Sequence, residues 1–334
     1  MAEETPARGG GIWAAADLLT PMAVRVAATL RLADHIAAGT RTTEALAEAV
    51  HADPDVLGRL MDHLVSAGVL SSTGAAAYDL TTMGRYLCDG EPEGMRSVLD
   101  IEGAIGHAEL SLVHLLHTVR TGEPAFPQQY GLPFWDDLSA NDERAESFDA
   151  LMGARLKAHA PAVAAAYPWG RLGHVVDVGG GDGSMLITIL QSHGDLRGTV
   201  VDLAGPVRRA GKAIAAAGLE HRADAVVGSF FDELPAGADA YLLSSILHNW
   251  NDAAAARIMR RCTDAASATG RVLVVDYFTD QSVLTEGDLR MLCYFGGRQH
   301  TLGQLGELAG STGFEITSIM PAGRLSVVEL RASH

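Results

Sequence analysis

The stretch Val175-Val176-Asp177-Val178-Gly179-Gly180-Gly181-Asp182-Gly183 decides the fold that we predict for this chain. It has the pattern of a short apolar strand that leads into a glycine-rich turn, and an apolar helix is expected to begin at Ser184. Glycines in such a turn let the backbone bend sharply and approach a ligand closely, because they carry no Cβ. The unpaired N–H groups at the start of the following helix would face the same ligand. The stretch therefore predicts one wall of a nucleoside-binding site.

An acidic residue follows the next predicted strand. Thr199-Val200-Val201 ends in Asp202, nineteen residues after Gly183. A carboxylate at about this distance suits the two hydroxyls of a ribose. We therefore expect Asp202 to bind a ribose. The alternative for Asp202, and also for Asp177, is a carboxylate that caps a turn.

Predicted strands and helices alternate from residue 174 onward. Strands are expected at 175–178, 199–202, 225–230, 240–247 and 272–278, and helices at 184–193, 206–217 and 252–268. This alternation predicts a parallel, doubly wound sheet, which binds its ligands at the carboxyl ends of the strands. Residues that follow strands are Gly179, Asp202, Ser229-Phe230 and His248, so these are the first candidates for a site.

The first hundred residues have the pattern of a winged helix-turn-helix. Thr42 or Thr43 can cap one helix, Asp53-Pro54 can open a second, and Ser72-Thr73-Gly74 turns a small hairpin. DNA binding is one interpretation, and a structural or dimerising module is the other. Residues 1–100 hold 7 Arg and no Lys against 14 Asp and Glu, which disfavours contact with phosphates.

Three further segments can be assigned from their patterns. Residues 12–38 are alanine-rich and apolar at helical spacing with few charges, which favours a subunit interface. An amphipathic helix is expected over 105–119, and a proline-containing loop over 122–133. The helix carries three histidines that lack the i, i+4 spacing of a metal pair, so we expect ordinary helix positions or a pocket lining. They are His107, His114 and His117.

Composition excludes several classes of protein. The 334 residues allow about two domains, and a hydrophobic content of 48% indicates a globular chain. A net charge of −16, with only two lysines among 25 basic residues, argues against a nucleic-acid binder. There is no apolar run of about 18 residues, no signal core, and no disulfide or zinc spacing among the three cysteines. We expect a soluble cytoplasmic protein.

The glycine-rich turn alone does not identify the cofactor, because sites for NAD, FAD and S-adenosylmethionine (SAM) all use such a turn. The dinucleotide fingerprint requires glycine or alanine at position 184, where this chain has Ser184. The chain also has no second glycine fingerprint. These observations disfavour a dinucleotide.

Four motifs occur together in this chain. They are Val176-Asp177-Val178-Gly179-Gly180-Gly181-Asp182-Gly183, Gly228-Ser229-Phe230-Phe231, Leu247-His248-Asn249-Trp250-Asn251-Asp252 and Asp288-Leu289-Arg290-Met291-Leu292. In this order they resemble the SAM-dependent small-molecule O-methyltransferases, which include plant phenolic enzymes and actinomycete antibiotic-pathway relatives. Within the family, the chain resembles in particular the naphthoate O-methyltransferases of enediyne biosynthesis. The resemblance covers nearly the whole chain from Leu18.

The resemblance implies a domain organisation and an activity. The implied fold is an α/β class with a Rossmann-like methyltransferase domain at 166–334 that binds SAM. A mainly helical winged-helix domain at 1–100 would swap helices to form a homodimer, and residues 101–165 would link the domains and border the acceptor pocket. The implied acceptor is a phenolic hydroxyl of a polyketide-derived aromatic of the aryl or naphthoic acid type. No metal is implied.

Site residues follow from the resemblance position by position. The implied cofactor-binding residues are Arg155, Asp177, Gly179, Gly181, Asp202, Ser229, Phe230 and Ser244. Within this set, Asp202 would hold the ribose, Ser229 and Phe230 would flank the adenine, and Arg155 would reach the SAM carboxylate. The implied acceptor-pocket residues are Phe148, Met152, Met291 and Phe295, and further candidates for the pocket are Trp13, His107, Phe134 and Trp135.

His248 is the predicted general base. Methyl transfer mainly needs alignment, because the SAM methyl group is already activated, and removal of the phenol proton adds rate. Histidine suits this role, and Asp276 matches the acidic residue that orients it. The alternative for His248 is a polar core residue. The chain departs from the family at Asn249, where most members have aspartate, and at Gln299, which replaces a second acidic partner and cannot compensate an imidazolium.

Two other functions compete with methyl transfer. One is a SAM-binding relative of altered chemistry, such as a hydroxylase or decarboxylase, and the other is a winged-helix regulator. Retention of His248 favours methylation, and the acidic N-terminal half disfavours the regulator.

Overall fold

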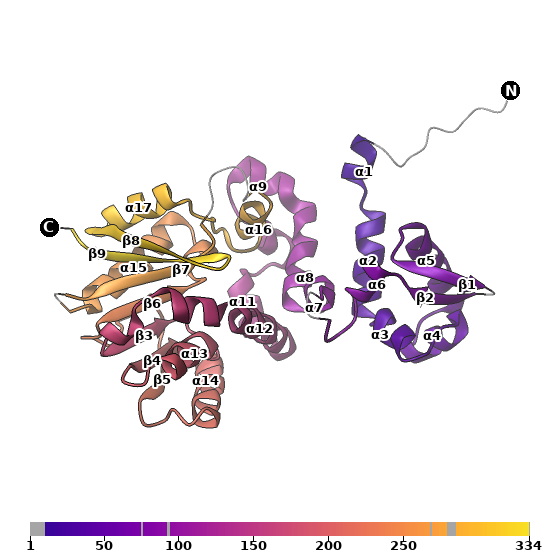
Figure 1. The fold of residues 1–334 in the computed structure, drawn as a ribbon. Helices are drawn as coiled ribbons and strands as arrows, with labels where there is room; N and C mark the ends of the chain where they lie inside the picture. Colours follow the sequence, from indigo (N-terminus) through magenta and orange to yellow (C-terminus); the bar gives the residue numbers. More distant parts are fainter. Residues whose placement is uncertain (1–10, 75, 92–93, 268, 279–284, 334) are drawn as a thin grey trace. The chain divides into compact units, whose positions relative to one another are not determined.

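A computed structural model describes residues 11–74, 76–91, 94–267, 269–278 and 285–333 (Figure 1). The chain forms two compact units, residues 1–110 and residues 111–334. None of the helices in these described ranges has the length and apolar character that crossing a membrane requires.

The N-terminal unit is mainly helical. Its elements are α1 (Ile12–Ala16), α2 (Leu19–Thr29), α3 (Leu32–Ala37), α4 (Thr43–Val50), α5 (Pro54–Ser66), β1 (Leu70–Gly74), β2 (Ala77–Leu80), α6 (Thr82–Arg85), α7 (Arg96–Leu99) and α8 (Ala104–Leu110). The side chains of Thr42 and Asp53 accept hydrogen bonds from backbone N–H groups and cap α4 and α5, as predicted. Because β1 pairs antiparallel with β2, the expected pattern of two helices followed by a hairpin is present.

Two groups of apolar residues in the N-terminal unit differ in burial. The core packs buried side chains of α3, α4 and α5, among them Ile36, Leu46 and Met61. A second group, on α1 and the start of α2, lies outside this core, and each member is more than half exposed. This group is Ile12, Trp13, Leu18 and Leu19. The unit's own core therefore leaves these side chains uncovered.

The C-terminal unit joins a helical segment to a sheet of seven strands. The helical segment contains η1 (Ser111–His114), α9 (Leu115–Thr121), α10 (Ala125–Tyr130), α11 (Phe134–Ser139), α12 (Asp142–Ala166) and η2 (Trp169–Arg171). The remaining elements are β3 (His174–Val178), α13 (Ser184–Ser192), β4 (Arg197–Asp202), α14 (Ala204–Ala216), β5 (Ala223–Val227), β6 (Ala240–Ser244), η3 (Leu247–Asn249), α15 (Asp252–Ala265), β7 (Arg271–Asp276), α16 (Thr285–Phe295), α17 (Leu302–Gly310), β8 (Phe314–Ala322) and β9 (Leu325–Ala332).

The sheet has the strand order β5-β4-β3-β6-β7-β9-β8. The first five strands in this order are parallel, whereas β9 runs antiparallel to both β7 and β8. The predicted Rossmann-like fold is confirmed, but the sheet is mixed and not wholly parallel. The sequence pattern missed β8 and β9, because they are joined directly by a tight turn at Gly323 (φ 68°) and no helix separates them.

Helices cover both faces of the sheet (Figure 1). One core lies between the strands and α12, α13 and α14, with Val163, Leu186 and Val200 at its centre. The other lies between the strands and α15 and α17, where Ile258 and Leu305 are fully buried. Burial on both faces explains why the central strands are almost continuously apolar.

Two predictions for the helical segment are wrong. The helix expected over 105–119 is interrupted, since α8 ends at Leu110 and a 3-10 turn separates it from α9. The loop expected over 122–133 contains α10. Its prolines are tolerated because Pro124 lies at the N-cap of α10 and Pro127 lies in its first turn, where the missing N–H groups would have no helical partner.

Three strands end earlier than predicted, since the strand expected at 272–278 is β7 and ends at Asp276. The expected ranges 225–230 and 240–247 shorten to β5, which ends at Val227, and β6, which ends at Ser244. After β6 the backbone of Ser245 adopts a left-handed conformation (φ 57°) and leads into η3. As a result Ser229 and Phe230 lie on the loop after β5, and His248 lies in η3 after β6. All three are beyond the strand ends, the region where such sheets bind ligands.

Candidate active site

The glycine turn after β3 is joined to the end of β4. Gly179, Gly181 and Gly183 all have positive φ angles, of 72°, 61° and 77°. The Gly181 N–H donates to Oδ2 of Asp202 over 2.8 Å, and the Leu203 N–H donates to the other oxygen over 2.7 Å. A Cβ built on Gly181 would meet no described atom within 4 Å, so this side of the turn is open to a ligand.

Asp177 is an unsatisfied buried carboxylate. Its side chain is 1% exposed, and neither oxygen has a hydrogen-bond partner among the described residues. Burial, followed by the nearby negative charges of Asp202 and Asp182, raises the pKa of Asp177 to about 7. A cationic or hydrogen-bond-donating ligand would relieve this cost, so the geometry suits a ligand better than the turn-capping alternative.

The other predicted cofactor residues have different surroundings. Ser229 Oγ accepts a hydrogen bond from the Phe231 N–H, so this side chain shapes its own loop. Phe230 lies beside the glycine turn, since a Cβ on Gly179 would be 3.3 Å from its ring. The hydroxyl of Ser244 is buried without a partner in the described chain. Arg155 projects from α12 with an exposed side chain, and no described carboxylate pairs with it.

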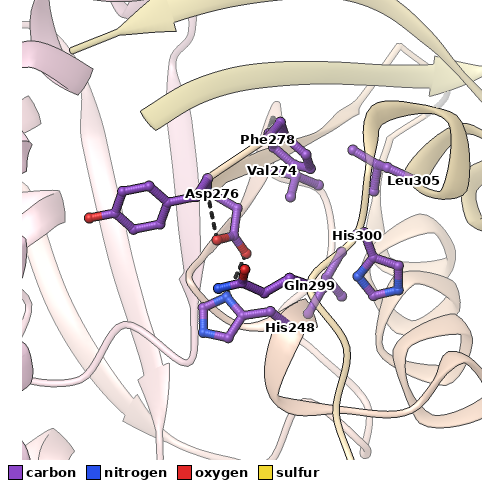
Figure 2. A pocket seen from close by; sticks show the side chains of 9 residues that line it. His248, Val274, Asp276, Phe278, Gln299, His300 and Leu305 are labelled. Carbon is purple, nitrogen blue, oxygen red and sulfur yellow. Dashed lines mark hydrogen bonds and ion pairs between the residues drawn. The ribbon is translucent and has the colours of Figure 1, made fainter. Parts of the chain in front are cut away.

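His248 and Asp276 form a hydrogen-bonded pair at the carboxyl ends of β6 and β7. Nδ1 of His248 lies 2.7 Å from Oδ2 of Asp276, and the other Asp276 oxygen accepts from the Tyr277 N–H over 2.8 Å. The two side chains are 18% and 9% exposed. Figure 2 shows the pair pointing toward each other. With Nδ1 protonated and donating to the carboxylate, Nε2 is left as a free acceptor for a proton.

Opposing effects act on the pKa of His248. Burial alone would lower this pKa, but the charge of Asp276 and its hydrogen bond outweigh burial and raise the pKa above the ordinary histidine value. The pair therefore forms a stronger base than an isolated buried histidine would be. A stronger base suits proton removal from a phenol.

Gln299 lies beside this pair. It lines the same narrow crevice as His248, Asp276 and His300, and Figure 2 shows its amide directed toward the pair. Gln299 Oε1 is buried without a partner among the described residues. His300 is not part of the His248–Asp276 pair, because its Nε2 lies 3.4 Å from a different carboxylate, that of Asp252. Burial lowers the pKa of His300. Asp276 is thus the carboxylate that contacts His248.

The segment that carries Gln299 approaches the backbone of His248 closely. The Arg298 N–H donates to the His248 carbonyl over 3.0 Å. A Cβ on Gly297 would lie 2.2 Å from that carbonyl oxygen, so only glycine fits there. Asn249, the other departure from the family pattern, donates its amide to the Ser245 carbonyl over 3.2 Å and so holds the loop of η3.

Aromatic side chains from α11, α12 and α16 gather next to η3. Phe148 and Phe295, two of the predicted acceptor residues, both contact Trp135, at ring-centroid distances of 5.6 and 5.3 Å. Met152 on α12 and Met291 on α16 are half-buried. The structure brings Phe148 and Phe295 together around Trp135.

Two residues in this region were not predicted from the sequence. Trp250 packs edge-on against Phe230 and Phe231 at 5.6 and 4.8 Å. Leu203, directly after Asp202, is 57% exposed, although it is a large apolar side chain at a strand end. The available signal for Leu203 was its position as an apolar residue directly after Asp202, the carboxylate predicted to bind a ribose. Trp250 could have been found from its place in the motif of His248. Among the described residues, no group of three or more possible metal ligands is present.

Comparison with known proteins identifies the family. Residues 112–315 match the O-methyltransferase domain family, and residues 14–90 match the O-methyltransferase dimerisation domain family. A 2,7-dihydroxy-5-methyl-1-naphthoate 7-O-methyltransferase from Streptomyces carzinostaticus is 49% identical over 96% of this chain and 97% of its own length. The aclacinomycin 10-hydroxylase RdmB from Streptomyces purpurascens is 45% identical over 92% of this chain and 84% of its own length.

A solved structure agrees with these matches. It is NcsB1, an O-methyltransferase from neocarzinostatin biosynthesis, in complex with SAM and 2-hydroxy-5-methyl naphthoic acid. The TM-score is 0.94 at 48% identity, and the match covers 97% of this chain and 99% of NcsB1. The resemblance inferred from the four motifs is therefore confirmed, and the chain belongs to the O-methyltransferase family, with a methyltransferase domain and a dimerisation domain.

Proposed function

We propose that this O-methyltransferase transfers the methyl group of SAM to a phenolic hydroxyl of a naphthoic or related aromatic acid in secondary metabolism, with His248 as general base. The similarity to a naphthoate 7-O-methyltransferase and to NcsB1, which binds SAM and a naphthoic acid, supports the cofactor and the substrate class. The observation that carries the role of the base is the 2.7 Å hydrogen bond between His248 and Asp276.

The residues around the glycine turn fit SAM. Asp177 offers two buried, unpartnered oxygens, and the space beside Gly181 is open. A ligand with an ammonium and a sulfonium group would compensate the carboxylate of Asp177 and would fit the open space beside Gly181. Asp202, already oriented by the N–H groups of Gly181 and Leu203, keeps lone pairs that can accept from ribose hydroxyls.

The remaining cofactor contacts are assigned by position. Phe230 and Ser229 border the adenine at the end of β5, and Ser244 supplies a hydroxyl at the end of β6. Arg155 pairs with the carboxylate of the methionine part, which fits the lack of any described carboxylate beside it.

The proposed chemistry is an in-line displacement. When bound, SAM supplies a methyl group that is already activated by its sulfonium. Nε2 of His248 accepts the proton of the acceptor hydroxyl, and the oxygen gains the nucleophilic character of a phenolate. Asp276 stabilises the imidazolium that forms and holds the ring in the orientation that exposes Nε2. Phe148, Met152, Met291 and Phe295 hold the aromatic ring, so that the reacting oxygen is aligned.

Product mass tests the proposal. Purified protein is incubated with SAM and a panel of hydroxy-naphthoic and hydroxy-benzoic acids, and products are read by mass spectrometry together with S-adenosylhomocysteine. The expected result is a gain of one CH₂ per acceptor with one S-adenosylhomocysteine formed. No gain with any acid in the panel would overturn the assigned substrate class.

A hydroxylase is the second candidate, because RdmB, a named hydroxylase, is 45% identical to this chain. The same assay separates the two functions, since hydroxylation adds an oxygen atom and leaves no stoichiometric S-adenosylhomocysteine. The retained His248–Asp276 pair favours methylation, because hydroxylation does not require a base at the acceptor hydroxyl.

We further propose that the enzyme is a cytoplasmic homodimer. The match to a dimerisation domain and the exposed side chains of Ile12, Trp13, Leu18 and Leu19 support self-association. The cysteines Cys88, Cys262 and Cys293 are free, which suits a reducing compartment. Light scattering after size-exclusion chromatography measures the state, and a monomer at micromolar concentration would contradict the dimer.

A further inference from the structure

Trp135 is the centre of the aromatic group beside the base. Its ring lies nearly parallel to those of Trp250 and Phe295, at 17° and 18°, with centroid distances of 6.1 and 5.3 Å. Phe134 and Phe148 meet it edge-on at 5.0 and 5.6 Å. Four aromatic neighbours from three helices and the loop after η3 therefore fix the plane of the indole.

The indole lies between the two proposed binding regions. Trp250 is two residues beyond His248 and packs against Phe230, a proposed adenine contact. On the acceptor side, Phe148 and Phe295 are proposed to hold the aromatic ring. A residue that contacts both groups can set the position of one ligand relative to the other.

The indole N–H has no partner. Trp135 Nε1 is buried, and no acceptor lies within hydrogen-bond reach among the described residues. Indole nitrogen can only donate, and a buried donor without an acceptor is costly. Trp169 shows the usual solution in the same chain, because its Nε1 donates to the Val163 carbonyl over 3.1 Å. Trp135 is therefore in need of an oxygen that the described protein does not supply.

We propose that Trp135 is the specificity-determining residue for the acceptor, donating its indole N–H to the carboxylate of an aromatic acid. This inference rests on the proposed function, because it deepens the substrate class of that site. The carboxylate is the partner, and not the reacting hydroxyl, because that hydroxyl must lie at Nε2 of His248. An anionic oxygen is also the strongest acceptor that an N–H can meet in a buried site.

Binding measured by calorimetry tests the proposal. The probes are 1,4-dihydroxy-2-naphthoic acid, which the NcsB1 structure contains, and 1,4-dihydroxynaphthalene, the same ring without the carboxylate. Both are titrated into the dimeric enzyme loaded with S-adenosylhomocysteine. W135F keeps an aromatic ring but removes the N–H. We expect this variant to bind the acid about 10-fold more weakly, because one charge-assisted hydrogen bond is lost, and to bind the diol as the wild type does.

Two further variants complete the design. W135H keeps a ring N–H and should recover part of the preference for the acid. W169F removes an indole N–H in the core, so it should lower the melting temperature and leave the acid-to-diol ratio of affinities unchanged. An equal loss for acid and diol in W135F, no loss for either, or the same change in W169F would overturn the proposal.

The binding assay also separates this inference from the proposed function. If wild-type enzyme binds the acid through Trp135 but forms no methylated product, the proposed reaction fails and the inference stands. If wild type methylates the acid and W135F keeps the same KM and kcat for acid and diol, the inference fails and the proposed reaction stands.

Discussion

Replacing Asp276 by asparagine should move the pH profile of methyl transfer to lower pH. The carboxylate lies 2.7 Å from Nδ1 of His248, and its charge and hydrogen bond outweigh burial and hold the pKa of His248 above the ordinary value. In D276N the size of the side chain is kept and the charge is lost. Burial then acts alone, and burial lowers the pKa of a histidine.

The size of the shift follows from the geometry. Two unit charges about 4 Å apart interact by about 4 kcal/mol at an effective dielectric constant of about 20. One pKa unit corresponds to about 1.4 kcal/mol, so loss of the charge corresponds to at most about 3 units, and neighbouring charges usually shift a pKa by about 1–3 units. The base must be neutral to accept a proton. Activity therefore rises with pH through the pKa of His248, and this acidic limb should move down by at least about 1 unit.

The rate at the plateau should fall as well. A base of lower pKa accepts the phenol proton less readily, and an asparagine amide can donate to Nδ1 and stabilise the wrong tautomer. We expect kcat at high pH to fall by about 10-fold or more.

The assay measures kcat from pH 5 to pH 9 at saturating SAM, with methylated product quantified by chromatography. D252N is the matched control, because Asp252 neighbours a different histidine, His300, at 3.4 Å. D252N should leave the acidic limb of the profile in place. A limb in D276N that stays where it is in wild type, or moves to higher pH, would refute the reasoning.

Three further predictions concern the base and the cofactor site. H248A should lower kcat by about 10²-fold or more while calorimetry shows unchanged SAM affinity; full activity on a phenolic acceptor at pH 7 would exclude the base assignment. D202A should weaken SAM binding by about 10-fold, because hydrogen bonds to a charged group are lost, and unchanged affinity would remove the ribose role. The pKa of Asp177 is raised to about 7 in the folded protein. The stability that its proton contributes to the fold is therefore fully present below about pH 4 and is lost as the pH rises through 7. D177N should therefore raise the melting temperature of ligand-free enzyme more at pH 8 than at pH 4. The affinity for SAM should rise from pH 6 to pH 8 in wild type but not in D177N. The same pH dependence of SAM affinity in both proteins would contradict the proposed contact.

The part of the site that depends on strand ends could be predicted from the sequence. His248 and Asp276 are 28 residues apart, and the family resemblance paired them. His248 lies beyond β6 and Asp276 ends β7, and these parallel strands bring their carboxyl ends to one edge. The same rule related Asp202 to the glycine turn, where the structure shows a hydrogen bond from Gly181. Here a local pattern determines a tertiary contact.

Other features depend on packing that no local pattern contains. The arrangement of Trp135 with Phe148 and Phe295 requires the relative positions of three helices, and one of the adjoining segments, α10, was not expected to be helical at all. The unpartnered state of Asp177 is also a tertiary property, because its carboxylate becomes costly only when the surrounding elements exclude water. Strands β8 and β9 escaped prediction because the alternation of strands and helices ends before them.

The backbone of Gly297 approaches the carbonyl of His248 closely, and this contact holds the segment that carries Gln299 against the base. The Arg298 N–H is bonded to that carbonyl, and the Gln299 N–H donates to Oδ1 of Asp288 over 2.9 Å, so the backbone at position 299 is held beside the base. A single substitution at position 299 would therefore place a charge next to the imidazole (Figure 2). Q299E is thus a substitution through which evolution or protein engineering could change the working pH of this enzyme.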